Sequence, residues 1–393
     1  MHPGAAQSRT GRSATVVGLC ACVAALMLAA ACTADPGAEP EPIGPTPASE
    51  LTVALVLAPA IEEGAGDFGA VAGLERAIDA GVVAQTDTKV FEPNAQGTDR
   101  RAMVRSAADE GFDLVIAIGA AYTHAVDEVA RDHRRQLFAI VGGGAQPGRN
   151  VADMTFRRND AGFLAGAAAA MKSKSGLVGF VGGQSGTGLI EASQAGFEAG
   201  AREVDSDVGI LVAYVGEDPT AFADPGAAQA LAATMYANGA DVIAHDAGAS
   251  GAGVFAAAAD TAKLAIGADV DETLLVPPEE QEAILTSAVD RIDVVVEDTI
   301  RAAAEGTFVD GSHSFGLAQG GVDYAVNAVN DTPRLLSEAM QLRLDEVLSR
   351  VASGEIVVPT EPELEPELPA EPTSPPPTST PPTTTPPTGS ASV

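Results

Sequence analysis

Short, continuous runs of apolar residues alternate along this chain with longer stretches that have the spacing of amphipathic helices. The apolar runs predict seven strands, at residues 51–57, 113–118, 137–141, 177–181, 210–215, 241–244 and 264–268. The intervening stretches predict seven helices, at residues 69–80, 99–110, 122–132, 160–172, 188–204, 226–238 and 251–261. Strands that are apolar on both faces are typical of parallel sheets covered by helices. The pattern therefore predicts an α/β fold with doubly wound parallel sheets, whose ligands bind at the carboxyl ends of the strands.

A separate apolar stretch near the start of the chain runs up to Cys32 and follows the positive charges of Arg9 and Arg12. This arrangement is typical of a secretory signal peptide with small residues before its cleavage site. The cysteine after those small residues resembles the lipobox of bacterial lipoproteins, in which the cysteine is acylated and becomes the new N-terminus. We therefore predict a signal peptide over residues 1–31 and a lipid on Cys32. The alternatives are an uncleaved membrane anchor, cleavage without lipidation, and cleavage before Cys22.

The cysteine content and the charge limit the class of protein. Cys20 and Cys22 lie within the predicted signal peptide, so the mature chain keeps Cys32 alone and forms no internal disulfide. An exported domain of this kind must be held by its apolar core, which suits a large domain. The formal net charge of −32 disfavours nucleic-acid binding, because an acidic surface repels phosphate. It also provides no basic patch for anionic lipid, so membrane contact is expected through the lipid anchor alone.

Two segments of biased composition flank the predicted folded part. Residues 32–50 are rich in Pro, Glu and Ala and predict a flexible tether. Residues 357–393 are rich in Pro, Thr and Glu and predict a disordered tail, because they contain too few apolar residues to form a core. A solvated tail is the favoured interpretation, and an O-glycosylated spacer or a cell-wall contact is the alternative.

The sequence carries no recognisable catalytic or metal-binding motif. It has no Gly-x-Ser-x-Gly elbow, no Walker A sequence and no His-Glu-x-x-His, and its five histidines lack the spacing of metal ligands. Glu62 and Glu63 are interpreted as a solvated pair. We therefore predict no enzymatic activity, no metal and no cofactor. Two turns read Gly-x-x-Gly-x-Gly, at residues 183–188 and 248–253; they predict tight strand-to-helix turns, and Gly248 is also a candidate for backbone contact with a polar ligand.

Nine segments, in order along the chain, resemble a known family. They lie at residues 113–126, 154–166, 174–183, 195–200, 238–245, 251–255, 266–269, 285–293 and 353–359. Together they resemble the basic membrane protein family of nucleoside-binding lipoproteins that serve ABC importers. The resemblance extends from about residue 51 to residue 359. It implies a type I periplasmic-binding-protein fold, in which two Rossmann-like lobes joined by crossing strands close on a ligand.

The family fold implies boundaries for the two lobes. Lobe I is expected at residues 51–155 and 270–316, and lobe II at residues 156–269 and 317–356. The three passages between the lobes are expected near Phe156, Asp269 and Leu317. We also expect the chain to be a monomer.

The resemblance further implies residues that bind the ligand. Phe222 matches one of two aromatic residues that sandwich a nucleobase in the family, and Phe68 is the candidate for the other. Asp269 matches an acidic residue that binds ribose hydroxyls. This role suits a carboxylate, because it accepts hydrogen bonds from two adjacent hydroxyls.

Three positions depart from the family pattern. Ala58 stands in place of an Asp after the first strand, His124 in place of an Asp near the third turn, and Asp290 in place of a Lys in the late helix. The polar groups that recognise the edge of the base are therefore changed, which implies a changed ligand preference. Two interpretations are open: His124 and Asp290 pair across the cleft, or each is a solvated residue at its rim.

These patterns favour a lipid-anchored solute-binding protein on the extracytoplasmic face of the cell membrane. Its ligand is expected to be a nucleoside or a similar flat, hydroxylated small molecule, and its partners are expected to be the permease and ATPase of an ABC importer. The alternative is a surface sensor or interaction protein with the same fold, which the altered pocket residues would favour.

Overall fold

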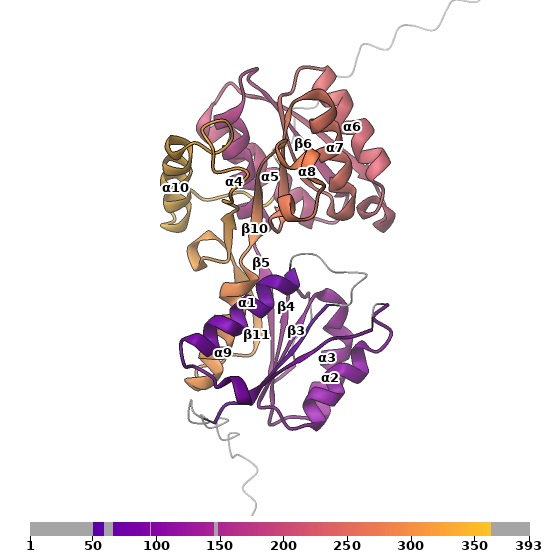
Figure 1. Cartoon of the computed structure of the whole chain (residues 1–393), viewed down its shortest axis with the longest axis vertical. Coiled ribbons are helices and arrows are strands. Elements are labelled where there is room, and N and C mark those ends of the chain that lie inside the picture. Colours follow the sequence, from indigo (N-terminus) through magenta and orange to yellow (C-terminus); the bar gives the residue numbers. More distant parts are fainter. Residues whose placement is uncertain (1–49, 59–65, 95, 145–147, 363–393) are drawn as a thin grey trace, which may run out of the picture. The chain divides into compact units, whose positions relative to one another are not determined.

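A computed structural model describes residues 50–58, 66–94, 96–144 and 148–362 of the chain. These residues form two six-stranded sheets with helices on both faces of each sheet (Figure 1). All seven predicted strands and all seven predicted helices are present, with ends within three residues of the predicted ones. The predicted α/β fold class is therefore confirmed. The predicted signal peptide, Cys32, all but the last residue of the tether, and the tail beyond residue 362 lie outside the described residues.

The first sheet has the strand order β11-β5-β4-β3-β1-β2, and all its strands are parallel. Its strands are β1 (Val53–Val56), β2 (Thr88–Phe91), β3 (Leu114–Ile118), β4 (Leu137–Val141), β5 (Val151–Phe156) and β11 (Gly311–Phe315). On one face lie α1 (Gly66–Asp79) and α9 (Ile292–Ala304), and on the other α2 (Arg100–Asp109) and α3 (Thr123–Asp132). Strands β1 and β3 are buried along their whole length, which explains their unbroken apolar sequences.

The second sheet has the strand order β12-β10-β9-β8-β6-β7, in which only β12 is antiparallel to its neighbour. Its strands are β6 (Leu177–Gln184), β7 (Gly209–Gly216), β8 (Val242–Asp246), β9 (Leu264–Asp269), β10 (Ile284–Asp290) and β12 (Val322–Tyr324). One face carries α4 (Arg158–Lys172), α5 (Leu189–Val204) and α10 (Glu338–Ala352), and the other carries α6 (Pro225–Ala237) and α7 (Gly251–Thr261). A short helix, α8 (Pro278–Gln281), precedes β10. Helices α4 and α5 pack so closely that Gly166 has no room for a side chain. A Cβ at this position would lie 2.0 Å from the carbonyl oxygen of Phe197.

The position of β10 corrects the expected second passage between the sheets. β10 runs parallel to β9 with Val289 opposite Asp269, so the chain leaves the second sheet only after Asp290. Residues 270–290 were expected in lobe I, and the structure instead places them in the layers of the second sheet. Asp290 likewise ends a strand, and the helix that follows it begins at Ile292.

The strand β10 was not predicted, because polar residues interrupt its apolar sequence. Thr286 and Ser287 lie in the middle of this strand, yet both are fully buried. The hydroxyl of Thr286 donates to the carbonyl of Ala325 at 2.8 Å, and that of Ser287 accepts the N–H of Glu272 at 3.2 Å. Polar side chains that are hydrogen-bonded inside the protein are tolerated in a buried strand. The edge strands β2 and β11 were not predicted because their central residues are exposed or partly exposed.

The segments that pass between the sheets are hydrogen-bonded to one another. The N–H of Arg157, after β5, donates to the carbonyl of Phe315 at 2.9 Å, and the N–H of Arg291, after β10, donates to the carbonyl of Gly321 at 2.9 Å. The first passage follows β5, and the third lies between β11 and β12. Each passage is therefore fixed by a neighbouring one rather than forming a free loop.

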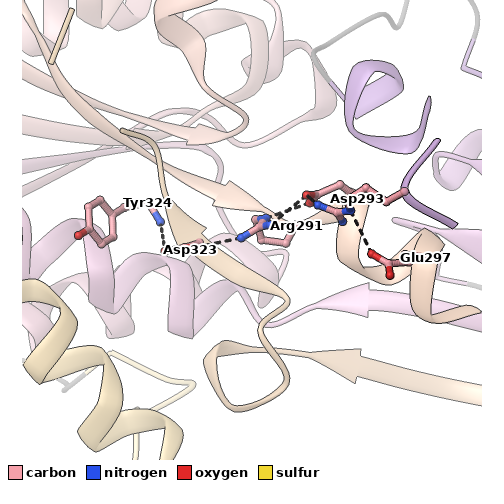
Figure 2. A network of polar contacts seen from close by, with 6 residues as sticks. Arg291, Asp293, Glu297, Asp323 and Tyr324 are labelled. Carbon is pink, nitrogen blue, oxygen red and sulfur yellow. Dashed lines mark hydrogen bonds and ion pairs between the residues drawn. The ribbon is translucent and has the colours of Figure 1, made fainter. Parts of the chain in front are cut away.

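Arg291 adds ion pairs to the passage between β10 and α9 (Figure 2). Its guanidinium donates to both carboxylate oxygens of Asp293, each at 2.9 Å, and to Asp323 of β12 at 3.2 Å. Arg76 of α1 also pairs with Asp293, at 2.5 Å, and with Glu297 at 3.0 Å. Burial opposes ionisation of Asp293, but hydrogen bonds from the two arginines lower its pKa overall. The network links helices of the first sheet to a strand of the second.

Candidate ligand-binding site

Three adjacent parallel strands of the second sheet end in an aspartate. β8 ends at Asp246, β9 at Asp269 and β10 at Asp290. Neighbouring strands are about 4.8 Å apart, so the carboxylate of Asp269 is close enough to raise the pKa of Asp246, and both carboxylates are close enough to raise the pKa of Asp290. We call these residues the aspartate cluster. They lie at the carboxyl edge of the sheet, where open α/β sheets bind ligands.

Arg158, the first residue of α4, provides positive charge to the aspartate cluster. Its Nη1 forms an ion pair with Oδ1 of Asp269 and lies 3.7 Å from Oδ1 of Asp246. The carboxylate of Asp269 raises the pKa of Arg158 against the effect of burial, with further contributions from the other two aspartates. One permanently charged guanidinium therefore faces three carboxyl groups.

Protonation reduces the excess negative charge of the cluster. Burial, together with the negative charges of Asp269 and Asp246, raises the pKa of Asp290 to about 8, although Arg158 acts in the opposite direction. Burial also raises the pKa of Asp246. At pH 7 Asp290 is therefore mostly protonated and can donate a hydrogen bond. The cluster thus presents both acceptors and a donor to a polar ligand.

The backbone of Asp269 adopts the left-handed conformation, with a φ of +65°. Aspartate occupies this region more readily than most residues. The preceding N–H, from Ala268, donates to the carboxylate of Glu272 at 2.8 Å, which fixes the turn after β9. The side chain of Asp269 is 40% exposed, and its contact with Arg158 uses Oδ1. Oδ2 can therefore accept hydrogen bonds from a ligand.

An ion pair between His245 and Glu272 stabilises the turn after β9. Nε2 of His245 lies 2.9 Å from the carboxylate of Glu272, and the imidazole packs edge-on against Phe255. Burial opposes the charged imidazole, but Glu272 raises the pKa of His245 overall. Gly251 at the start of α7 makes room for the imidazole, because a Cβ there would lie 2.1 Å from the ring. Glu272 is therefore held on one side by His245 and on the other by the turn after β9.

Phe222 lies at the same edge of the sheet. It ends the short 3₁₀ helix Pro219–Phe222 after β7 and is partly buried. Its ring lies against Gly183, near the end of β6. A Cβ built on Gly183 would lie 2.4 Å from a ring carbon. Gly248, after β8, has a φ of +54°, and its Cβ position lies 3.5 Å from the same ring. Gly183 thus permits the observed position of Phe222, and Gly248 borders the ring.

The other predicted glycine turn, at residues 183–188, has a structural role. The N–H groups of Gly186 and Gly188 donate to the carboxylate of Glu191, at 2.5 and 2.7 Å. Burial opposes the charge of Glu191, but these hydrogen bonds lower its pKa overall. Because a side chain of the chain itself occupies these donors, they do not bind a ligand here.

Two further predicted residues, Phe68 and His124, belong to helices of the first sheet. Phe68 lies in α1, but its side chain is outside the described residues, as is Cys32. His124 is exposed in the first turn of α3. The charged groups that act on Asp290 are Arg158 and the other two aspartates of the cluster. In this structure the groups that act on Asp290 belong to the second sheet and to α4. The pairing of His124 with Asp290 across the cleft stays a prediction.

Two residues of the site were not predicted, Arg158 and Asp246. The sequence contains a signal for each. Asp246 lies two residues after the predicted strand at residues 241–244, and Arg158 belongs to a pair of arginines at the start of the apolar helix α4. A charged residue at the end of a buried strand or at the start of a buried helix is a candidate for the ligand edge of the sheet.

Within the described ranges, no three His, Cys, Asp or Glu side chains are grouped as a metal site would require. In the same part of the chain, every helix is too short or too polar to span a bilayer.

Comparisons with known proteins bear on this site. Residues 71–361 match the Bmp family, described as "ABC transporter substrate-binding protein PnrA-like". The chain is 30% identical over 313 residues to the CD4+ T-cell-stimulating antigen of Listeria monocytogenes serovar 1/2a, which covers 76% of this chain and 83% of that protein. It is 29% identical over 284 residues to the ABC transporter nucleoside-binding protein BmpA of Lactococcus lactis subsp. cremoris, which covers 69% of this chain and 77% of that protein.

Solved structures are similar in fold. An ABC transporter solute-binding protein from Conexibacter woesei superposes with a TM-score of 0.65 and 22% identity, covering 79% of this chain and 99% of that chain. A second solute-binding protein, from Aeropyrum pernix K1, superposes with a TM-score of 0.56 and 22% identity, covering 79% of this chain and 94% of that chain. At this level of identity the similarity concerns the fold alone.

Proposed function

The chain belongs to the family of PnrA-like ABC transporter substrate-binding proteins, and we propose that it captures a nucleoside or a similar flat, hydroxylated molecule for an ABC importer. The family consists of binding proteins rather than enzymes. The observation that supports this ligand class is an aromatic ring and a partly exposed carboxylate at one edge of the same sheet, Phe222 and Asp269. An aromatic ring stacks on a flat base, and a carboxylate accepts from adjacent hydroxyls.

Arg158 affects how a ligand reaches Asp269. Because the guanidinium is bonded to Oδ1, ligand hydroxyls are expected to bind Oδ2 while the ion pair stays intact. A phosphorylated ligand would bring additional negative charge next to the aspartate cluster and is disfavoured by electrostatic repulsion. The proposed ligand is therefore a nucleoside rather than a nucleotide.

The proposed location is the extracytoplasmic face of the membrane, with a lipid on Cys32. The signal-peptide pattern before Cys32 supports this location. The importer's permease and ATPase are separate chains in this proposal, and the lipid keeps the binding protein close to them.

Thermal denaturation in the presence of nucleosides, free bases, sugars and nucleotides tests the proposed function. A ligand stabilises the folded protein by RT ln(1 + [L]/Kd), which is about 2.7 kcal/mol at a hundredfold excess over Kd. We expect a rise in Tm with at least one nucleoside and a smaller rise with its monophosphate. Unchanged Tm values with every nucleoside at millimolar concentration would contradict the proposed ligand class.

Substitution of Asp269 tests the site itself. Asp269→Asn keeps the size of the side chain but removes the charge, so most of the ligand-induced rise in Tm should disappear. Asp207→Asn is the matched control, because Asp207 is an exposed aspartate beyond the opposite end of the same sheet. If Asp269→Asn and Asp207→Asn responded equally to the ligand, Asp269 would not be its acceptor.

A further inference from the structure

A cavity of about 450 Å³ lies at the opposite end of the strands that carry the aspartate cluster. Its apolar lining includes Val242 and Leu264, the first residues of β8 and β9, and alanines from the end of α7. Each of these strands runs from the cavity to an aspartate of the cluster. The cavity is therefore separate from the candidate ligand-binding site.

Most of the lysines in the chain are gathered around this cavity. The sequence contains four lysines, and Lys172, Lys174 and Lys263 line the cavity together with Arg334. The fourth, Lys89, pairs with Glu110 at 2.7 Å in the first sheet. In a chain with a formal net charge of −32, four basic side chains around one cavity form a local region of opposite charge.

The carboxylates of the cavity are mostly occupied. Glu282 pairs with Arg334 at 3.2 Å. Asp241 accepts the hydroxyl of Ser173 at 2.6 Å and the backbone N–H of Lys174 at 2.7 Å. Both carboxylates are therefore bonded to groups other than the lysine ammonium groups, and those of Lys174 and Lys263 remain available to an incoming anion.

Lys172 shows the effect of this accumulated charge. Its ammonium group donates to the backbone carbonyls of Arg334 and Leu335, which carry no charge. Burial and the positive charges of Lys174 and Arg334 lower its pKa. Glu279, which is exposed, is the remaining carboxylate in the lining. The positive charges are thus only partly balanced.

We propose that the cavity binds the glutamate-rich segment of the chain's own C-terminal tail, residues 363–371. This segment reads Glu-Leu-Glu-Pro-Glu-Leu-Pro-Ala-Glu. Its four carboxylates complement the lysines, and its two leucines match the apolar lining. A segment tethered to its own site has an effective concentration in the millimolar range, so modest contacts suffice. The inference does not depend on the identity of the ligand at the aspartate cluster.

The length of the chain permits this contact. The side-chain amide of Asn159, near the start of α4, donates to the carbonyl of Val358 at 3.0 Å. Lys172 ends the same 15-residue helix, 13 residues after Asn159, so it lies about 20 Å from Asn159 at about 1.5 Å per residue. An extended chain covers about 3.3 Å per residue, so about six residues beyond Val358 span that distance. Residues 363–371 begin before this point and extend past it.

Acetylation of lysines tests the proposal, because all four lysines can be followed in one digest by mass spectrometry. The full chain and a chain ending at Pro362 are treated with an N-hydroxysuccinimide ester of acetic acid. We expect Lys174 and Lys263 to react at least about threefold faster in the shortened chain, while Lys89 reacts at the same rate in both. Equal rates at Lys174 and Lys263 would overturn the proposal.

Two further variants of the full chain test whether the glutamate charges, rather than the mere presence of the tail, protect the lysines. Replacement of the four glutamates at 363, 365, 367 and 371 by Gln should raise the lysine rates as removal of the tail does. Deletion of residues 373–393 alone should leave them unchanged. A synthetic peptide of residues 361–373, added to the chain ending at Pro362, should restore protection at Lys174 and Lys263. Protection that depends on residues 373–393, or on protein concentration, would point to another occupant and contradict the proposal.

Discussion

Arg158 and Asp269 lie 111 residues apart in the sequence and form an ion pair at the carboxyl edge of the second sheet. Asp269 therefore has two roles, since the proposed acceptor for ligand hydroxyls is also the counter-ion of Arg158. The ion pair joins the start of that helix to the end of β9. Substitutions at either residue should affect both the stability of this lobe and its affinity for ligand.

Arg158→Met should lower the free energy of unfolding by roughly 2–4 kcal/mol at pH 8. Breaking a buried ion pair costs about 3–5 kcal/mol, and the exposure of Asp269 reduces this value. The loss should be smaller at pH 5, where Asp290 and Asp246, whose pKa values are raised, can take up protons. Urea denaturation at the two pH values measures both losses.

Arg350→Met is the control for this prediction. Arg350 pairs with Glu203 and Glu355 on the surface of the same lobe, each at 2.7 Å. Solvent screens such pairs, so Arg350→Met should lose less stability than Arg158→Met. An equal loss of stability in Arg158→Met at pH 5 and pH 8 would argue against the role of Arg158 as counter-ion of the cluster.

Asp290→Asn should weaken the dependence of stability on pH. The pKa of Asp290 is raised to about 8, above the ordinary value of about 3.9. Between these values the folded protein retains a proton that the unfolded chain has lost, so the free energy of unfolding falls as the pH rises from about 4 to about 8. The asparagine variant lacks this contribution and should gain stability relative to the native chain as the pH increases.

Thermal denaturation of Asp290→Asn without ligand at pH 5 and pH 8.5 measures this change. We expect the difference in Tm from the native chain to become more positive by several degrees at least, because each pH unit between 5 and 8 removes up to about 1.4 kcal/mol of stability from the native chain alone. Asp331→Asn, at an exposed aspartate, should show no such change. Parallel Tm curves for Asp290→Asn and the native chain would show that Asp290 does not titrate in this range.

Gly183→Ala should reduce ligand affinity by displacing Phe222. The added Cβ would lie 2.4 Å from the ring, so the ring has to move away from the end of β6. We expect at least a tenfold increase in Kd in isothermal titration with a nucleoside that stabilises the native chain. Gly226→Ala is the control, because its Cβ would meet only Asp224, at 3.5 Å. Similar Kd values for the two variants would indicate that the ligand does not contact Phe222.

Arg291→Met should destabilise the connection between the two sheets. The substitution removes three charge-assisted hydrogen bonds, to Asp293 and Asp323, and we expect a loss of about 1–3 kcal/mol in the free energy of unfolding. Arg350→Met again provides the comparison, because both acidic partners of Arg350 belong to a single lobe. A loss no larger than that of Arg350→Met would show that the network contributes little.

Cys32→Ser should release the protein from membranes without changing the ligand response of the purified chain. Stable attachment requires the acyl chains that the serine variant cannot carry. Detergent phase partitioning of the expressed protein measures the change. Cys22→Ser should still partition with membranes, because Cys22 lies within the predicted signal peptide. Membrane retention of Cys32→Ser would contradict lipidation at this residue.

The alternation of elements was predictable from the sequence because most strands of a doubly wound sheet are buried and therefore continuously apolar. β1, β3 and β4 illustrate this. β10 was not predictable, since its central Thr286 and Ser287 are polar and satisfy their hydrogen bonds with partners from other segments. The second passage between the sheets was misplaced for the same reason.

The sequence by itself determined the alternation of the seven predicted strands and seven predicted helices. The resemblance to the family pointed to Phe222 and Asp269, and a glycine motif pointed to Gly248, because such signals are local in the chain. Only the tertiary structure decided which charges meet. The pairing of Arg158 with Asp269 depends on β8, β9 and β10 lying side by side and on α4 covering them. The three lysines around the cavity likewise meet because the sheet brings the first residues of its strands to one edge. Such contacts join distant segments, and their energies depend on burial and distance, which local sequence patterns do not contain.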